Sequence, residues 1–256
     1  MRQRAGMSPE LVTRVSMLVC MLVGVVAVPE VLERGLEQRV LALWGSVLGV
    51  DVGLLDRDGL VVVEDHRAVA AGRRATVRTA RGTLLLAAPV EGAVAAADPA
   101  AYAADVAARA HGVGLLHYLA APPAGDRDPR VRVLGAADCA LLDALQRAAG
   151  AAASEEAEVD VEHLLAVGIV EEGRLLAIAS LLDQSEDAVD VGVLVDPAAR
   201  RRGLGAAVVC DIAERAAMSG RLLQYRCNRE NESSALLART CGFMLWGVLT
   251  IAQQPD

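Results

Sequence analysis

The stretch VDPAARRRGLGAAVVCDIAERA, residues 195–216, decides how the second half of this chain is interpreted. It places three arginines and two glycines directly before an apolar pattern with helical spacing. A glycine-opened helix start exposes backbone N–H groups at the positive end of the helix dipole, where a diphosphate can approach the chain closely. Arg200, Arg201 and Arg202 add guanidinium groups that suit phosphate oxygens. The stretch therefore predicts a site for a phosphorylated ligand at the start of a helix over 204–217.

Two common phosphate-binding motifs are absent from this stretch. A Walker A loop needs a lysine, and the chain contains none. A dinucleotide fingerprint needs a third glycine after Gly203 and Gly205, but Ala206, Ala207 and Val208 follow instead. Taken alone, the pattern also fits a plain helix cap that carries surface arginines.

Composition limits the class of protein. With 256 residues, 54% of them hydrophobic, the chain can bury a full core, and its formal charge of -8 disfavours nucleic acid as a partner. Five cysteines without a CxxC pair argue against a disulfide framework or a metal site, and favour a cytoplasmic location. The apolar run 17–28 reads as part of a buried helix over 9–28, with a cleaved signal peptide as the alternative, and is too short to span a membrane.

The order of predicted elements gives a mixed α/β fold in two unequal parts. The first part has helices over 29–48 and 99–110 and strand-like runs over 60–65, 82–90 and 113–120, with Gly- and Arg-rich turns between the first two runs. The segment APPAGDRDPR, 121–130, is typical of a linker. We therefore predict an N-terminal α/β domain of unclear role over 1–125 and a second domain over 126–256.

The second domain is predicted to hold an ordered series of strands and helices. Strands over 130–135, 164–170, 175–182 and 189–195 are joined by short turns, and a helix over 138–149 and an acidic stretch over 154–163 lie among them. The helix over 204–217 leads to a strand over 222–227, a helix over 231–240 and closing strands over 242–253. This series predicts a mixed sheet covered by helices.

With its flanking strand, VGVLVDPAARRRGLGAAVV resembles the acyl-CoA-binding motif of the GNAT superfamily of N-acyltransferases. In that motif a strand ends in Val-x-Pro and is followed by Arg200, Gly203 and Gly205 in the defining places. Downstream, Asn231 and Ser234 before a helix that ends in Gly-Phe are similar to the family's next segment. The resemblance covers about residues 130–250. The first domain matches none of the family's motifs, and analogy with some small-molecule acetyltransferases is the only basis for the alternative that it is a degenerate GNAT-like half.

The resemblance implies acetyl-CoA as the cofactor and a direct attack of an amine on its thioester. It implies that the strand over 189–195 diverges from the strand over 222–227, so that the pantetheine arm lies between them. A strand N–H, that of Val193 or Leu194, would then polarise the thioester oxygen. The predicted cofactor-binding residues are Val193, Leu194, Val195, Arg200, Arg201, Arg202, Gly203, Leu204, Gly205, Ala206, Asn231 and Ser234.

The acid and base are less well defined by the resemblance. Many members carry a tyrosine four residues before Gly-Phe, where this chain has Ala238. We predict Ser234 and Tyr225 as substitutes for the acid, acting through water, with burial in the core as the alternative for Tyr225. Asp190 is the predicted base, with a solvated edge carboxylate as the alternative. His163 is a further, weaker candidate.

The function predicted from these residues is an N-acetyltransferase that transfers an acetyl group from acetyl-CoA to a primary amine of a small molecule. The alternatives are a catalytically inactive acyl-CoA-binding module and a protein or peptide N-acetyltransferase. The sequence predicts no nucleic-acid, membrane or metal partner, and a monomer or homodimer. The acidic stretch over 154–163 would suit a cationic amine, but a solvated face explains it equally well.

Overall fold

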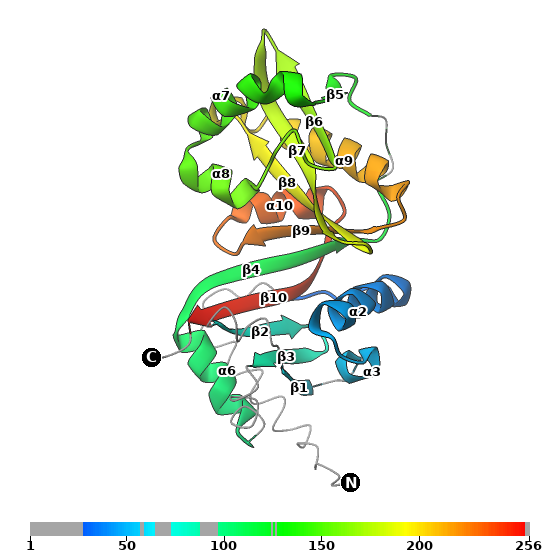
Figure 1. Ribbon diagram of the computed structural model, residues 1–256, viewed down its shortest axis with the longest axis vertical. Helices are drawn as coiled ribbons and strands as arrows, with labels where there is room; N and C mark the ends of the chain where they lie inside the picture. The colour runs from blue at the N-terminus through cyan, green and yellow to red at the C-terminus, as the bar shows by residue number, and fades with distance from the viewer. Residues whose placement is uncertain are drawn as a thin grey trace. The chain divides into compact units, whose positions relative to one another are not determined.

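The computed structural model describes residues 28–56, 59–64, 73–87, 97–123, 125 and 127–253 (Figure 1). Its contacts divide the chain into two compact units, one of residues 1–115 and 245–256 and the other of residues 116–244. This division places 116–125 in the second unit and the last strand in the first, so it differs from a simple cut at residue 125. The partition into domains over 1–125 and 126–256 stays a prediction.

The first unit combines helices with an open mixed sheet. β1 pairs in parallel with β3, and β2 lies antiparallel to both β3 and β10. The elements are α2 (Arg34–Leu48), α3 (Val52–Leu55), β1 (Gly59–Glu64), β2 (Arg73–Thr79), β3 (Gly82–Ala87), α6 (Pro99–Ala108) and β10 (Met244–Gln253).

Local sequence signals account for the helices of this unit. Helix α2 buries Leu36, Val40 and Leu43 along one face and ends at Gly49, which adopts the left-handed conformation that glycine tolerates at a helix end. The Asp98 side chain caps α6 by accepting the backbone N–H of Ala101. The predicted helix over 9–28 lies outside the described residues.

One prediction for the first unit is wrong. The Gly- and Arg-rich segment between the first two strand-like runs contains strand β2, not only turns. Three consecutive residues of β2, Ala75, Thr76 and Val77, are buried, so burial in this strand does not alternate between two faces. Arginines precede and follow these residues, so the segment lacks the apolar run that indicates a strand.

The second unit is a mixed sheet with strand order β9-β8-β7-β6-β5. β5, β6, β7 and β8 pair antiparallel in sequence order, whereas β8 and β9 are parallel and joined by α9. The elements are β4 (Ala110–Leu119, shared with the first unit), β5 (Val131–Val133), η1 (Ala136–Asp138), α7 (Cys139–Ala149), α8 (Ala151–Ala157), β6 (Leu165–Glu171), β7 (Arg174–Ser185), β8 (Ala188–Val195), η2 (Pro197–Ala199), α9 (Leu204–Ala217), β9 (Leu222–Asn228) and α10 (Glu232–Thr240).

Helices on this sheet supply much of its core. Helix α7 packs against β7 and β8, and α9 packs against β6, β7, β8 and β9 (Figure 1). Leu142 and Leu145 of α7 join Ile178 and Leu194 of the strands in one buried apolar cluster. The mixed α/β fold is therefore confirmed. Among helices in the described ranges, none has the length and apolar character needed to cross a membrane.

Helix α8 was predicted only as an acidic stretch. It buries none of its residues, so the apolar spacing that reveals other helices is missing. Its end is nevertheless held tightly against the sheet at Gly192. A Cβ on Gly192 would lie 2.3 Å from the carbonyl oxygen of Ala157, so only glycine allows this approach.

Candidate functional site

The candidate site is a fork between β8 and β9. The two strands pair only over Ala188–Asp190 and Leu222–Gln224 and then diverge. β8 stays paired with β7 on its other edge as far as Val195, which faces Ala177. The strand is thus held straight while the backbone groups on its open edge, beyond Asp190, have no partner strand among the described residues.

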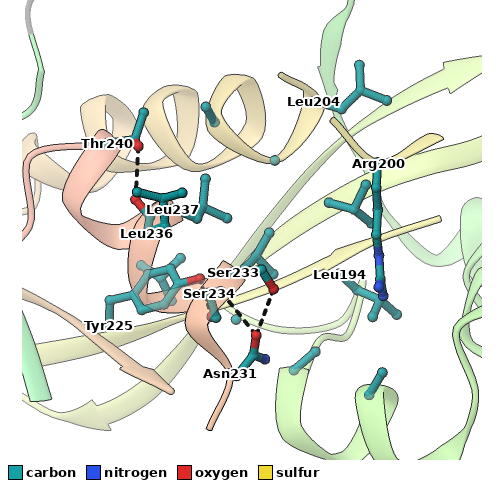
Figure 2. Close-up of a pocket in the computed structure, with 18 of the residues that line it drawn as sticks. Leu194, Arg200, Leu204, Tyr225, Asn231, Ser233, Ser234, Leu236, Leu237 and Thr240 are labelled. Carbon is teal, nitrogen blue, oxygen red and sulfur yellow. Dashed lines mark hydrogen bonds between the residues drawn. The ribbon is translucent and has the colours of Figure 1, made fainter. Parts of the chain in front are cut away.

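A cavity of about 400 Å³ occupies the space beyond this fork (Figure 2). A cavity of this size accommodates a small-molecule ligand. Five segments line it. Strand β8 contributes residues 191–195, the turn and the start of α9 contribute residues 199–201 and 203–206, and β9 contributes Tyr225 and Arg226. Helix α10 and its cap contribute Asn231, Ser233, Ser234, Leu236, Leu237 and Thr240, and α8 contributes Ala153, Glu156 and Ala157.

The start of α9 presents backbone donors to this cavity. The first bond of the helix ladder runs from the N–H of Ala207 to the carbonyl of Gly203, at 3.0 Å. The N–H groups of Leu204, Gly205 and Ala206 precede that ladder, and all three residues line the cavity. The positive end of the helix dipole therefore faces the place predicted for a phosphorylated ligand.

The two glycines have different roles. Gly203 caps α9 with a φ of 76°, a left-handed conformation, and a Cβ there would meet no atom within 4 Å. A Cβ on Gly205 would instead lie 3.2 Å from the Leu237 side chain, so its small size allows α9 to pack against α10. The sequence interpretation assigned both glycines to ligand approach, but the surroundings of Gly205 are protein side chains.

The three arginines also differ. Arg200 and Arg201 line the cavity, and Figure 2 shows Arg200 extended on the same side as Leu204. Arg202 does not line it. Its guanidinium donates to Glu171 at 2.9 Å, and this bond lowers the pKa of the Glu171 carboxyl. The structure thus brings two of the three predicted arginines to the site.

A hydrogen-bonded hydroxyl pair lies at the fork. The Tyr225 hydroxyl and Ser234 Oγ are 2.8 Å apart, and both residues line the cavity (Figure 2). Tyr225 is the first residue of β9 beyond the pairing with β8, and its ring packs edge-on against Phe243. Burial raises the pKa of Tyr225 well above its usual range, although the bond to Ser234 opposes this. The phenol therefore stays protonated at neutral pH and can donate.

Asn231 fixes the start of α10. Its Oδ1 accepts the backbone N–H of Ser234 at 3.1 Å, and its Nδ2 donates to Glu156 at 3.1 Å. Because Glu156 belongs to α8, the pair connects two walls of the cavity. Asn231 thus positions Ser234.

Asp190 lies immediately before the fork, buried to 5% exposure. Its Oδ2 accepts from Arg226 Nε at 2.5 Å, and Arg226 also donates to Glu158 at 3.2 Å. Burial raises the pKa of Asp190 despite the neighbouring guanidinium. Asp190 is not among the residues that line the cavity, whereas Arg226 is. Asp190 is therefore not a solvated carboxylate at the sheet edge, and it does not line the cavity.

His163, the remaining candidate, does not line the cavity, and neither do Ala238 and Cys227. His163 Nδ1 is 3.0 Å from the Ser180 hydroxyl, and neither residue lines the site. Ala238 is completely buried on α10. Burial raises the pKa of the Cys227 thiol to about 11, which does not suit a nucleophile at neutral pH.

Several lining residues were missed by the sequence interpretation. Ser233, Leu236, Leu237 and Thr240 lie on one face of α10. Their spacing of three or four residues is the helical period, so this face could have been found once Ser234 was placed on it. Glu156 lies in the acidic stretch that the sequence offered for a cationic amine, although helix α8, which carries it, was not predicted.

Part of this unit is similar to a known protein family. Residues 133–243 match the family model described as the acetyltransferase (GNAT) family. No curated protein matches the chain.

Three solved structures illustrate the fold that the chain resembles. An acetyltransferase assigned to the GNAT family from Novosphingobium aromaticivorans is 23% identical over 57% of this chain and 66% of its own, with a TM-score of 0.47. A GNAT-family acetyltransferase from Colwellia psychrerythraea is 16% identical over 60% of each chain, with a TM-score of 0.45. A GCN5-related N-acetyltransferase from Kribbella flavida is 19% identical over 61% of this chain and 63% of its own, with a TM-score of 0.43. The match therefore spans less than two thirds of the length of each of the three.

Proposed function

We propose that this protein is a GNAT acetyltransferase, because residues 133–243 match that family's model, and that it transfers an acetyl group from acetyl-CoA to a primary amine of a small molecule. The observation that carries this proposal is the fork. β8 and β9 separate beyond Asp190 and Gln224, and the start of α9 lies at the cavity between them. The peptide acceptor and the inactive binding module are the alternatives.

The residues of the cavity fit the parts of acetyl-CoA. The N–H groups of Leu204, Gly205 and Ala206 and the guanidinium groups of Arg200 and Arg201 would hold the diphosphate. The open edge of β8 over Val193–Val195 would bond to the amides of the pantetheine arm, as an added strand would. A Cβ placed on Gly203 would have no protein atom within 4 Å, so the cradle has room for phosphate oxygens.

Acetyl-CoA supplies, when bound, an acyl group activated as a thioester. A backbone N–H of β8, from Val193 or Leu194, would donate to the carbonyl oxygen as negative charge develops on it. The protein would hold the amine in line with the carbonyl carbon, which removes much of the entropic cost of the reaction. No covalent acyl-enzyme is part of this proposal, because the thiols of Cys227 and Cys241 have raised pKa values.

Tyr225 is the proposed acid for the departing thiolate. Its hydroxyl is protonated at neutral pH, and Ser234 lies within hydrogen-bond distance to orient it or to relay the proton. This pair would replace the tyrosine whose family position is held by Ala238. The presence of the pair favours a working enzyme over an inactive binding module.

Asp190 was predicted as the base, and in this proposal it has a positioning role. Its bond to Arg226 orients a side chain in the wall of the cavity, and Glu158 holds the same guanidinium from the end of α8. Proton removal from the ammonium by Asp190, through water, stays a prediction, as do the cytoplasmic location and the oligomeric state.

Two measurements test the proposed function. Calorimetry with acetyl-CoA is expected to give one site per chain, and a thiol-reactive dye is expected to report coenzyme A release when small primary amines are added. Binding without thiol release from any amine would support the inactive module. Release only with peptides would support the peptide acceptor, and no binding of acetyl-CoA would refute the proposal.

A further inference from the structure

The wall that α8 contributes to the cavity carries one charged side chain, that of Glu156. Glu156 Oε1 accepts two hydrogen bonds, one from the backbone N–H of Asn228 at 3.0 Å and one from Asn231 Nδ2 at 3.1 Å. These bonds hold the carboxylate between the end of β9 and the start of α10. The other oxygen, Oε2, accepts no hydrogen bond from the described residues. One oxygen is therefore fixed by the protein, and the other is available to a donor in the cavity.

Arg226 brings a positive charge to the wall, but its partners neutralise it. Its guanidinium donates to Asp190 and, at the end of α8, to Glu158. With Asp190 ionised, these three side chains carry one net negative charge, and with Asp190 protonated they carry none. Arg229, on the turn after β9, does not line the cavity. Glu156 therefore leaves this side of the cavity negative in both cases.

A second carboxylate behind this wall lacks full compensation. Asp190 is only 5% exposed, and its Oδ1 has no hydrogen-bond partner among the described residues. A buried carboxylate of this kind is costly unless donors or positive charge surround it. Because Asp190 is bonded to Arg226, which lines the cavity, a cation bound at this side would lower that cost. Asp190 thus points to a positively charged ligand independently of Glu156.

The start of α9 gives the cavity a positive side. Arg200, Arg201 and the positive end of the helix dipole lie there. Figure 2 shows Leu204, at the start of α9, and Asn231, which holds Glu156, on opposite sides of the cavity. A diphosphate is attracted to the first side and a cationic ligand to the second. The charges of the wall therefore separate the proposed acetyl donor from a cationic acceptor.

We propose that the acceptor is an amine with a second cationic group, and that Glu156 Oε2 binds this second group. The inference rests on the proposed function and names its substrate class. The reacting nitrogen gives one proton to solvent and forms the C–N bond as the C–S bond breaks, and its second proton replaces the one that Tyr225 gives to the sulfur. The other ammonium group keeps its protons and donates to Glu156 in a charge-assisted hydrogen bond. A carboxylate at the same place would be repelled.

A series of unbranched terminal diamines, from diaminopropane to diaminohexane, tests this substrate class. The rate of coenzyme A release is measured for each diamine, for the monoamine of the same length and for the matching aminocarboxylate. At least one diamine should exceed its monoamine about tenfold in kcat/KM, well above the gain of about twofold from having two reactive ends, and the aminocarboxylate should be the poorest acceptor. Added salt should reduce the gain. A series in which no diamine exceeds that twofold gain, or in which an aminocarboxylate is best, would overturn the proposal.

Glu156→Gln and Glu155→Gln are a matched pair of variants. Both remove one charge from α8, but Glu155 does not line the cavity. The amide oxygen in Glu156→Gln can still accept from Asn228 and Asn231, so this variant should fold, and thermal unfolding checks it. The ratio of diamine to monoamine kcat/KM should fall to about twofold in Glu156→Gln and keep the parent value in Glu155→Gln. A diamine preference that survives in Glu156→Gln would leave Glu156 only a structural role and would overturn the proposal.

Calorimetry separates a failure of this inference from a failure of the proposed function. A diamine titrated into the protein in the presence of coenzyme A should bind more tightly than its monoamine, and Glu156→Gln should remove the difference. Absence of thiol release with every amine would refute the proposed function, while this binding difference would still support the cation site. Thiol release combined with equal binding of diamine and monoamine would refute the cation site alone.

Discussion

Replacing Gly203 with Asp or with Asn separates the charge of the proposed diphosphate site from its shape. Gly203 has a φ of 76°, and Asn and Asp tolerate this left-handed region better than other residues with a side chain. Their Cβ would meet no protein atom within 4 Å. Both side chains can also accept an N–H of the first turn of α9, as helix-capping residues do. The two variants should therefore fold alike, with a stability within about 1 kcal/mol of the parent.

The difference between the variants is one negative charge at the site of the diphosphate. Two unit charges about 4 Å apart interact by about 1 kcal/mol in water and about 4 kcal/mol at the effective dielectric of a protein surface. Each 1.4 kcal/mol is about a tenfold change in affinity. With about two phosphate charges nearby, Gly203→Asp should bind coenzyme A at least about tenfold more weakly than Gly203→Asn.

Calorimetry with coenzyme A on the parent and both variants measures this difference. Raising the salt concentration should reduce the gap, because screening weakens exposed charge interactions. Thermal unfolding serves as the folding control. Equal affinity of the Asp and Asn variants, with both folded, would show that the diphosphate does not bind at the start of α9.

Three further outcomes are expected. Tyr225→Phe should lower the rate of thiol release by about 10²-fold at neutral pH, and the defect should shrink above about pH 8.5, where the thiol leaves unprotonated; a defect independent of pH would argue against an acid role. Gly192→Ala should destabilise the protein by about 1–3 kcal/mol, because the methyl group would lie 2.3 Å from the Ala157 carbonyl, and an unchanged denaturation midpoint would contradict this. Asp138→Asn removes a carboxylate whose pKa is lowered in the folded protein by Arg132. The stability that this carboxylate contributes is present above about pH 4, near its unfolded pKa, and is lost as the pH falls through its lowered pKa in the folded protein. Urea titrations of Asp138→Asn and its parent should therefore converge in acid, and a constant difference would refute the assignment.

The sequence predicted the elements that carry strong local signals. The helix expected over 204–217 is α9 with the same bounds, because a glycine precedes it and apolar residues follow at helical spacing. The crossover from β8 through α9 to β9 followed from the order of these elements. Helix α8 and strand β2 were not predicted, because α8 buries none of its residues and β2 is flanked by arginines and has no apolar run.

The geometry of the site depends on long-range contacts that no local pattern encodes. The family resemblance implied that β8 and β9 diverge, but that their pairing ends at Asp190, while β8 stays paired with β7 as far as Val195, is seen only in the structure. The hydrogen bond between Arg202 and Glu171 likewise joins distant parts of the chain. It holds one of the predicted cofactor-binding residues outside the cavity lining. The motifs thus predicted which segment lines the candidate site. Which residues of that segment face the cavity depends on tertiary contacts.

This chain has Ala238 where many GNAT members have a tyrosine, and the position of Tyr225 gives a physical reason for the small residue. Ala238 is completely buried, and its carbonyl accepts the N–H of Phe243 at 3.0 Å. The Tyr225 ring packs edge-on against the Phe243 ring, so an aromatic side chain from β9 already fills the interior beside the end of α10. A second large ring at position 238 would overpack this region. In the proposed function, the hydroxyl that donates the proton therefore comes from β9 instead of α10.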